Sequence, residues 1–530
     1  MREDMDVVFH GADVVDGTGV ARFRADVGIM SGRIAVIDAD GEDGLSGQRD
    51  VDADGLVLSP GFIDMHAHSD LALLSDPEHL AKVSQGCTLE VLGQDGLSYA
   101  PVDDDGMSQL WEQLAAWNGR PTIDTSWRTV GQYLDRLDLG CAVNAAYLLP
   151  HGTIRLAVMG WQDRPPNDSE LDRMRELVAR GMRDGALGMS AGLSYPPGMF
   201  ADTDELVALC EVVAQFGGYF SPHQRSYGAG ALEGYAEMIE IGRRSGCPVH
   251  LAHATMNFEV NRGRASELLD LVDAASDVDV TMDTYPYLPG ATSLAALLPS
   301  WSMAAGPQRC RERLADPVSR ERIRYELDVA GTDGAHGVPV DWRGIEISGV
   351  VRPEHQHLVG RSVAEAAAGV APSQFYLDLL LAEDFGTSCI MHVGHEDNVR
   401  EIMRHRVHMG GSDGLLVGDR PHPRAWGTFP RYLGRYARDE KVLSLEECVM
   451  HLTSRPAARL GLPDRGLIRE GMVADVVLFD PETVADTATF EQPRQVARGI
   501  PYVMVNGRLA VDQGRRTEVL AGRSVRRRGD

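Results

Sequence analysis

The apolar residues of this chain follow one pattern at its two ends and another in its middle. Near the N-terminus, short apolar runs are separated by turns, and Ser31-Gly32 between two of these runs is typical of a hairpin. The C-terminal part repeats the pattern, with Asn506-Gly507 as a second hairpin turn. Because both ends are rich in short strands, we predict that residues 1–58 and 461–530 together form a small β-sandwich.

The middle of the chain, residues 59–460, alternates strand-like apolar runs with helical patterns. The helical patterns cover residues 203–216, 231–245, 264–275 and 364–370. The strand-like runs are residues 89–92, 142–149, 218–220, 248–251, 278–282, 389–391 and 408–409. Such alternation predicts βα units, and about eight strands over this length favour an α/β fold, a (β/α)8 TIM-like barrel, over an open sheet. Residues 297–350 interrupt the alternation and are predicted to be an insertion or lid.

Length and charge agree with this organisation and exclude some partners. A chain of 530 residues is too long for one ordinary core, which fits one large and one small domain. The net charge of −27 argues against binding to nucleic acid or to an anionic membrane surface. No apolar run is long enough to span a membrane. The arginine-rich residues 523–528 are predicted to be a solvated basic tail.

The cysteines point to a reducing compartment. All seven are scattered, none forms a Cys-x-x-Cys pair, and their number is odd. The N-terminal residues 1–4 are acidic and no apolar segment follows them, unlike a secretory signal peptide. We therefore expect a cytoplasmic protein that acts on a small molecule, and the sequence is compatible with a homo-oligomer.

Histidine and aspartate residues follow several predicted strands. His66 and His68 come directly after an apolar run, and residues i and i+2 of a strand point to the same face. Further candidates that follow strands are Asp95, His223, His253 and Asp413. The strands of a barrel all end at the same face, so residues that follow them lie close together. Imidazole and carboxylate groups in one place are good ligands for Zn²⁺. Zinc lowers the pKa of a bound water to near 7, and a neighbouring carboxylate then transfers the proton. Asp413 is the predicted base.

With these residues in place, the chain resembles the amidohydrolase superfamily, specifically its N-acyl-D-amino-acid deacylase (D-aminoacylase) branch. The resemblance covers nearly the whole chain and rests on the segments 60–68, 190–198, 283–287, 411–414 and 422–430. It implies a (β/α)8 barrel with a small β-sandwich, one or two zinc ions or another divalent metal, and hydrolysis of an N-acyl bond. The ligand positions implied by the resemblance are His66, His68, His223 and His253, and the implied base is Asp413.

Two positions depart from that branch. Where the deacylases carry a zinc-binding cysteine, this chain has Asp95, a harder ligand that can bridge two metals or favour a different ion. Other superfamily members bridge their metals with a carboxylated lysine, but no lysine lies between Lys82 and Lys441. Asp95 is thus the best candidate for the bridge, and a simple turn aspartate is the alternative.

The second departure concerns the substrate. Thr255 stands where the branch has a lysine that resembles a carboxylate anchor, and threonine cannot form that ion pair. Arg225 is the candidate replacement, because a guanidinium holds a carboxylate with two hydrogen bonds. Tyr285 matches a tyrosine near the substrate of the branch and is a candidate donor. Tyr195 is a further candidate substrate contact, although it sits in a loop-shaping Tyr-Pro-Pro segment.

The prediction is metal-dependent hydrolysis of an amide C–N bond, best matched by deacylation of N-acyl-D-amino acids. Two alternatives within the superfamily remain open: a hydantoinase-like hydrolase of cyclic amides, and a deaminase of heterocycles. A non-catalytic metal-binding scaffold would be expected to have lost the base or several ligands, whereas Asp413 and all four histidines are present.

Overall fold

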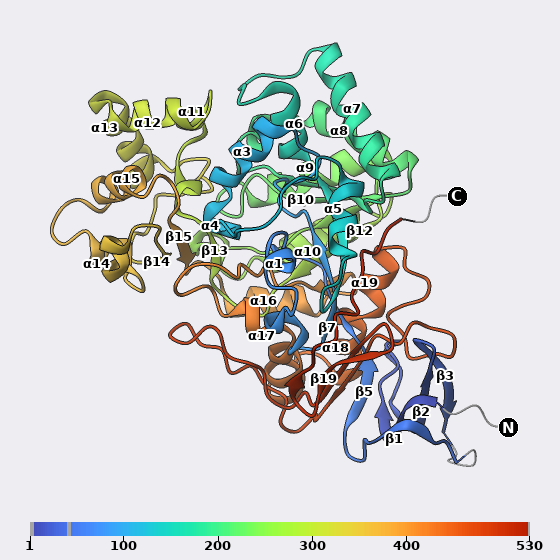
Figure 1. The fold of residues 1–530 in the computed structure, drawn as a ribbon. Helices are drawn as coiled ribbons and strands as arrows, with labels where there is room; N and C mark the ends of the chain where they lie inside the picture. Colours follow the sequence, from blue (N-terminus) through green and yellow to red (C-terminus); the bar gives the residue numbers. More distant parts are fainter. Residues whose placement is uncertain (1–4, 40–43, 528–530) are drawn as a thin grey trace.

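The computed structural model describes residues 5–39 and 44–527 (Figure 1). The acidic residues 1–4 and Arg528 of the basic tail, which entered the sequence-based predictions, lie outside this described part. Within it, no helix is long and apolar enough to cross a membrane. All seven cysteines are buried free thiols, as predicted.

Both chain ends contribute to a single nine-stranded sheet, which confirms the predicted β-sandwich. Its strand order is β20-β19-β18-β17-β5-β1-β2-β3, with β4 paired to β1. The N-terminal strands are β1 (Met5–Val14), β2 (Phe23–Met30), β3 (Arg33–Asp38), β4 (Gly47–Asp52) and β5 (Val57–Pro60). The C-terminal strands are β17 (Val476–Phe479), β18 (Tyr502–Val505), β19 (Arg508–Asp512) and β20 (Arg515–Arg516). Antiparallel pairing of β5 with β17 joins the two ends.

The two predicted hairpins are present, and their turns have the expected backbone. Ser31 and Gly32 have φ of 52° and 77°, and Asn506 and Gly507 have φ of 50° and 79°. Two consecutive residues with positive φ make the turn whose twist matches that of the flanking strands. Both hairpins therefore follow from local sequence.

Eight parallel strands form the barrel, as predicted, in the order β16-β12-β11-β10-β9-β8-β7-β6. They are β6 (Phe62–Asp64), β7 (Cys87–Leu92), β8 (Asn144–Pro150), β9 (Gly188–Gly192), β10 (Tyr219–His223), β11 (Val249–Leu251), β12 (Val280–Thr284) and β16 (His408–Gly410). The N–H of Met65 donates to the carbonyl of Gly410 at 3.2 Å, which brings the first and last strands together.

Helices surround this barrel (Figure 1). They are α1 (Ala72–Ser75), α2 (Leu80–Val83), α3 (Asp104–Gln113), α4 (Ala115–Asn118), α5 (Val130–Leu137), α6 (His151–Met159), α7 (Asp168–Arg183), α8 (Thr203–Gln215), α9 (Ala231–Ser245), α10 (Ala265–Ala274), α16 (Glu396–Met403), α17 (Arg424–Arg431), α18 (Leu445–Leu452) and α19 (Ser454–Arg459). The predicted helices 203–216, 231–245 and 264–275 agree with α8, α9 and α10 to within a residue.

The apolar run before His66 is divided between two sheets. β5 belongs to the sandwich and β6 begins the barrel, with Gly61 between them. A Cβ on Gly61 would lie 2.2 Å from the Oγ1 of Thr88, so only glycine allows this close approach. The chain therefore passes from one domain to the other immediately before the predicted ligands.

The insertion is larger than predicted and has its own sheet and core, at the upper left of Figure 1. Its strands are β13 (Gly290–Ser293), β14 (Ile345–Gly349) and β15 (Ser388–Met391), and its helices are α11 (Ser300–Met303), α12 (Pro307–Ala315), α13 (Pro317–Tyr325), α14 (Val363–Ala366) and α15 (Pro372–Ala382). Residues 389–391, predicted as a barrel strand, form β15 instead. A short strand buried in a second core has the same apolar pattern as a barrel strand.

Within the described residues 523–527, the basic tail is not freely solvated but packs against the barrel. The N–H of Val525 donates to the carbonyl of Ala145 at 2.7 Å. The Nη2 of Arg526 lies 2.6 Å from Asp135 Oδ1 and 2.8 Å from Asp138 Oδ2. Complementary charge on α5 and just after it explains why the tail is held there.

Candidate active site

The six predicted ligand and base positions lie just beyond the C-terminal ends of barrel strands. His66 and His68 follow β6, and His223 is the last residue of β10. Asp95, His253 and Asp413 come two or three residues after β7, β11 and β16. All six are buried, and the barrel collects them at one face.

One group of side chains consists of His66, His68, Asp95 and Asp413, whose potential ligand atoms lie within 4.8 Å of one another. The Nε2 of His66 is 3.4 Å from Asp95 Oδ1 and 3.8 Å from Asp413 Oδ1. The Nε2 of His68 is 3.5 Å from Asp95 Oδ2 and 3.3 Å from Asp413 Oδ1. Two carboxylates and two imidazoles thus face one point.

A second group consists of Asp95, His223 and His253. The Nδ1 of His223 is 3.7 Å from Asp95 Oδ2, and the Nε2 of His253 is 3.3 Å from Asp95 Oδ1. The two ring nitrogens lie 3.0 Å apart. Asp95 belongs to both groups, the arrangement a bridging carboxylate requires.

The side chains present fit a divalent metal. Both ring nitrogens of His66 and the Oδ1 of Asp95 are buried without a hydrogen-bond partner. Buried polar atoms are rarely left unpaired, because losing water without a replacement partner costs free energy. Coordination of a cation would give these atoms their partner, and imidazole with carboxylate is a donor set typical of zinc.

Charges within the site keep both carboxylates ionised. Burial raises the pKa of Asp413, but the Arg424 guanidinium and His68 outweigh it and hold the pKa below its ordinary value. Burial also raises the pKa of Asp95, and His66, His253 and His223 outweigh it. Ionised carboxylates are the form that binds a metal or accepts a proton.

Three of these residues adopt an uncommon backbone conformation. Asp95, His253 and Asp413 have φ of 54°, 32° and 48°, in the left-handed region that side chains disfavour. Such strain gathers at functional sites, where surrounding structure enforces it. Asp283 supplies part of that support, since its Oδ1 accepts from the N–H of His253 at 3.0 Å and its Oδ2 lies 2.9 Å from His250 Nε2.

A cavity of about 70 Å³ opens onto these groups. Tyr195, Thr255 and Tyr285, three of the predicted substrate contacts, line it. Arg225 does not: its Nε is 2.7 Å from Glu237 Oε2, and its Nη2 donates to the carbonyl of Ala201 at 2.7 Å. The structure therefore corrects the expectation that Arg225 replaces the missing lysine.

Arg424, to which the sequence reasoning assigned no role, does not line the cavity itself but contacts Asp413 and Tyr285, which do. Its Nη2 is 2.8 Å from Asp413 Oδ2, and its guanidinium lies 4.4 Å from the centre of the Tyr285 ring. It is fully buried, and its Nε and Nη1 have no hydrogen-bond partner. Arg424 lies in the segment 422–430, one of those on which the resemblance rests, and this was the sequence signal that could have identified it.

The insertion also reaches the cavity, through His336. This imidazole packs 5.6 Å from the Tyr227 ring, and its Nδ1 is buried without a partner. Burial lowers the pKa of His336 to about 3, so the ring is neutral. Sequence reasoning missed it because no strand precedes it.

The sequence and the fold were compared with those of known proteins. A model of the amidohydrolase family matches residues 49–511 of the chain. The chain belongs to the amidohydrolase family. The D-aminoacylase of Alcaligenes xylosoxydans xylosoxydans is 35% identical to this amidohydrolase over 518 residues, covering 95% of this chain and 94% of the relative.

Two solved structures place the whole amidohydrolase chain in the same fold. A D-aminoacylase structure superposes with a TM-score of 0.83 at 34% identity, covering 99% of this chain and 100% of the other. The N-acyl-D-glutamate deacylase from Bordetella bronchiseptica, solved with zinc and a phosphonate inhibitor, gives 0.82 at 32% identity, covering 98% and 100%. The predicted barrel with its sandwich is thereby confirmed.

Beneath the site of this amidohydrolase, Lys82 is the centre of a fully buried polar network. Its Nζ is 2.6 Å from Asp64 Oδ2, 2.6 Å from Glu90 Oε1 and 2.9 Å from the hydroxyl of Ser412. The Oδ1 of Asp64 accepts from the N–H of His66 at 3.2 Å and of Ser412 at 2.8 Å. Asp64 thus holds the two turns that carry His66 and Asp413.

Replacing Lys82 by methionine is expected to lower the free energy of unfolding by about 3–5 kcal/mol, because it leaves two buried carboxylates without their cation. Urea denaturation followed by circular dichroism measures this. Lys441, the other lysine, is exposed, so Lys441→Met is a matched control with little expected effect. Equal stability of the two variants would contradict a structural role for the network.

Proposed function

We propose that this chain is a metal-dependent deacylase of N-acyl-D-amino acids. The observation that carries the proposal is the convergence of two ligand groups on the shared carboxylate of Asp95. The names of the similar proteins support an N-acyl-D-amino acid as substrate. A metal held by these residues would act as a Lewis acid and lower the pKa of a bound water.

Proton transfer and hydrogen bonding to the substrate are assigned to side chains of the protein. Asp413, ionised and facing His68 at 3.3 Å, accepts the proton of the attacking water and gives it to the leaving amine nitrogen. Tyr285, whose pKa burial raises to about 12, stays protonated and donates a hydrogen bond to the substrate. The guanidinium of Arg424 packs over its ring, 4.4 Å from the ring centre.

Arg424 is assigned to the substrate carboxylate, because it is a buried guanidinium with two N–H groups unpaired. Its remaining Nη2 stays with Asp413, so the anchor and the base are connected. Thr255, which lines the cavity, is neutral and supplies no cation of its own for that carboxylate.

Arg424→Lys is expected to lower kcat/KM by about 10²–10³-fold, because a lysine offers a point charge in place of two directed N–H bonds. The loss should appear mainly in KM for N-acyl-D-amino acids. It should be smaller for the corresponding N-acyl amines, which carry no carboxylate. Equal losses on both substrates would assign Arg424 to support of Asp413 alone.

The proposal is tested by assaying released amine from N-acetyl and N-formyl amino acids of both hands, with hydantoins and aminopurines as comparison substrates. Hydrolysis of the D-forms at rates well above the L-forms is the expected result. Turnover of cyclic amides or of heterocycles alone would favour the two alternative activities. A protein that stays metal-free after metal-supplemented expression would contradict the whole scheme.

A further inference from the structure

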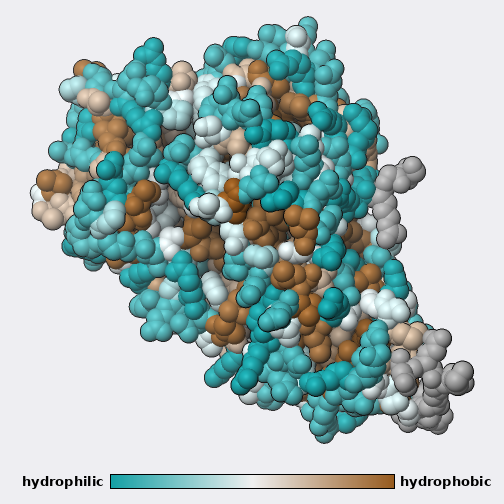
Figure 2. Space-filling view, viewed as in Figure 1, coloured by the Kyte–Doolittle hydropathy of each residue, from teal (hydrophilic) through white to brown (hydrophobic). Residues whose placement is uncertain are grey.

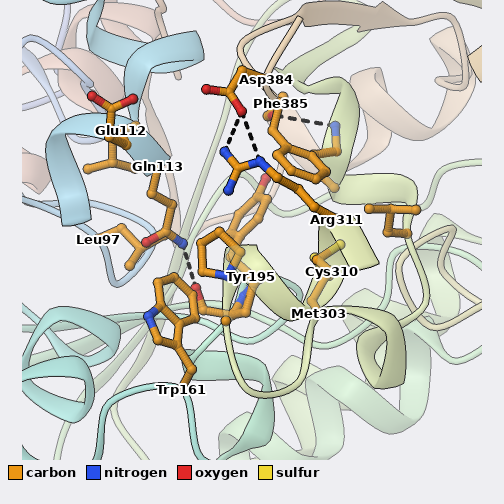
Figure 3. A pocket seen from close by; sticks show the side chains of 18 of the residues that line it. Leu97, Glu112, Gln113, Trp161, Tyr195, Met303, Cys310, Arg311, Asp384 and Phe385 are labelled. Carbon is orange, nitrogen blue, oxygen red and sulfur yellow. Dashed lines mark hydrogen bonds and ion pairs between the residues drawn. The ribbon is translucent and has the colours of Figure 1, made fainter. Parts of the chain in front are cut away.

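A second cavity lies beside the candidate active site, between helices α3 and α4 of the barrel and the insertion (Figure 3). It has a volume of about 120 Å³ and is partly open to solvent. Its walls are mostly apolar and include Leu114, Trp161, Ala295, Leu298, Met303 and Phe385. Most of the surface in Figure 2 is hydrophilic, and apolar groups gather along the middle of that face.

Two aromatic side chains separate this cavity from the active site and line both. The ring of Trp117 lies 5.2 Å from that of His68 and 4.8 Å from that of Tyr195. Tyr195 in turn lies 4.8 Å from His223. The predicted metal ligands and the apolar cavity are therefore one side chain apart.

Strand β13 shows which end of the substrate faces the cavity. Its first three residues, Gly290 to Thr292, line the active site, and the last, Ser293, lines the apolar cavity. The carbonyl of Ala291 accepts from Arg424 Nη2 at 3.3 Å. Arg424, the proposed carboxylate anchor, thus contacts the part of the strand that lines the active site, and the apolar cavity begins two residues further along.

In an N-acyl amino acid, the acyl chain lies on the far side of the amide from the carboxylate. We propose that the apolar cavity binds this acyl chain, so that the substrates are amino acids carrying an aliphatic acyl group of several carbons. This inference rests on the proposed deacylase function and adds the substrate class.

The rings of Trp117 and Tyr195 are in contact, 4.8 Å between centroids, so the acyl chain reaches the cavity only when the ring of Tyr195 rotates out of this wall. Tyr195 is held in the wall by one hydrogen bond, 3.0 Å between its hydroxyl and that of Thr292, and Figure 3 shows its ring between Gln113 and Cys310. At the far side, Arg311 Nε donates to Asp384 at 3.0 Å. This charged pair ends the apolar space and limits the acyl length.

The test uses two substrate series with the metal-loaded enzyme. In the first, D-alanine carries acyl groups from acetyl to octanoyl. Here kcat/KM is expected to rise about fourfold per added methylene, as expected for burial of hydrocarbon, until the cavity is full. In the second, N-acetyl-D-amino acids carry linear side chains of increasing length, and kcat/KM is expected to change little.

Variants that fill the cavity give an independent check. Ala295→Phe and Ala296→Leu, both at half-buried positions in its wall, should flatten the dependence on acyl length. Ala364→Leu, half-buried in the insertion but away from the cavity, is the control and should keep it. If one of the two cavity-filling variants fails to fold, the other still tests the proposal.

The outcomes separate the two proposals. Hydrolysis of N-acetyl-D-alanine with no gain for longer acyl groups would overturn the acyl-chain assignment and leave the deacylase function intact. A gain along the side-chain series alone would also overturn it, by assigning the cavity to the amino-acid side chain. Absence of hydrolysis on every N-acyl amino acid would overturn the deacylase function itself.

Discussion

Replacing Asp413 by asparagine is expected to lower kcat by about 10²–10⁴-fold, the usual contribution of a general base. Asparagine keeps an oxygen near the position of Oδ1 but cannot take a proton at neutral pH. Metal content should stay close to that of the parent protein, because His66, His68 and Asp95 remain. Steady-state rates on N-acetyl-D-amino acids and elemental analysis of the same samples measure the two effects.

Loss of fold is the main competing explanation for an inactive variant at this position. Asp413 balances the buried charge of Arg424, so the variant also loses stability, and its circular dichroism must be recorded at the assay temperature. Asp419→Asn, an exposed aspartate in the same loop, is the matched control and should keep full activity. A folded Asp413→Asn protein that retains its turnover would assign the base to another residue.

Removing the Asp95 side chain is expected to have the second largest effect, through metal binding. Asp95 belongs to both candidate ligand groups, so Asp95→Ala should deplete both positions, whereas His253→Ala should weaken one. Metal content measured after dialysis against a chelator should fall further in Asp95→Ala than in His253→Ala. Equal contents would indicate a turn aspartate that bridges nothing.

The identity of the ligand at position 95 should also set metal preference. Asp95→Cys places a soft thiolate where the chain has a hard carboxylate, and soft ligands favour zinc over manganese. Loading each protein from an equimolar mixture of the two ions, followed by elemental analysis, should show a higher zinc-to-manganese ratio for the cysteine variant. Asp95→Asn controls for the backbone, because asparagine also tolerates the positive φ observed there.

The local sequence pattern predicted those elements whose structure depends on residues close together in the chain. The hairpins at Ser31-Gly32 and Asn506-Gly507 follow from turn residues, and α9 was predicted to the residue. The ligand candidates also follow from local pattern, because a barrel sends every strand end to one face. The six candidate residues named from the sequence are thus the ones that the structure brings together in the two groups.

Pattern failed where a residue's role depends on distant partners. β9 was missed because Gly188–Gly192 has a single large apolar residue, Met189, among glycine, serine and alanine, and so shows no apolar run. β15 was assigned to the wrong sheet, since burial in either core produces the same apolar run. Arg225 was chosen for its nearness in sequence to His223, yet Glu237 on α9 holds it away from the cavity.

By itself, the sequence determined the barrel, the sandwich built from both ends and the set of groups able to bind a metal, because these depend on periodicity and on residue type. Only the tertiary structure decided that Asp95 belongs to both ligand groups and that Arg424 contacts Asp413. It also brought the insertion against α3 and α4 to form the apolar cavity. Each of these outcomes rests on contacts between residues far apart in the chain, which no local pattern encodes.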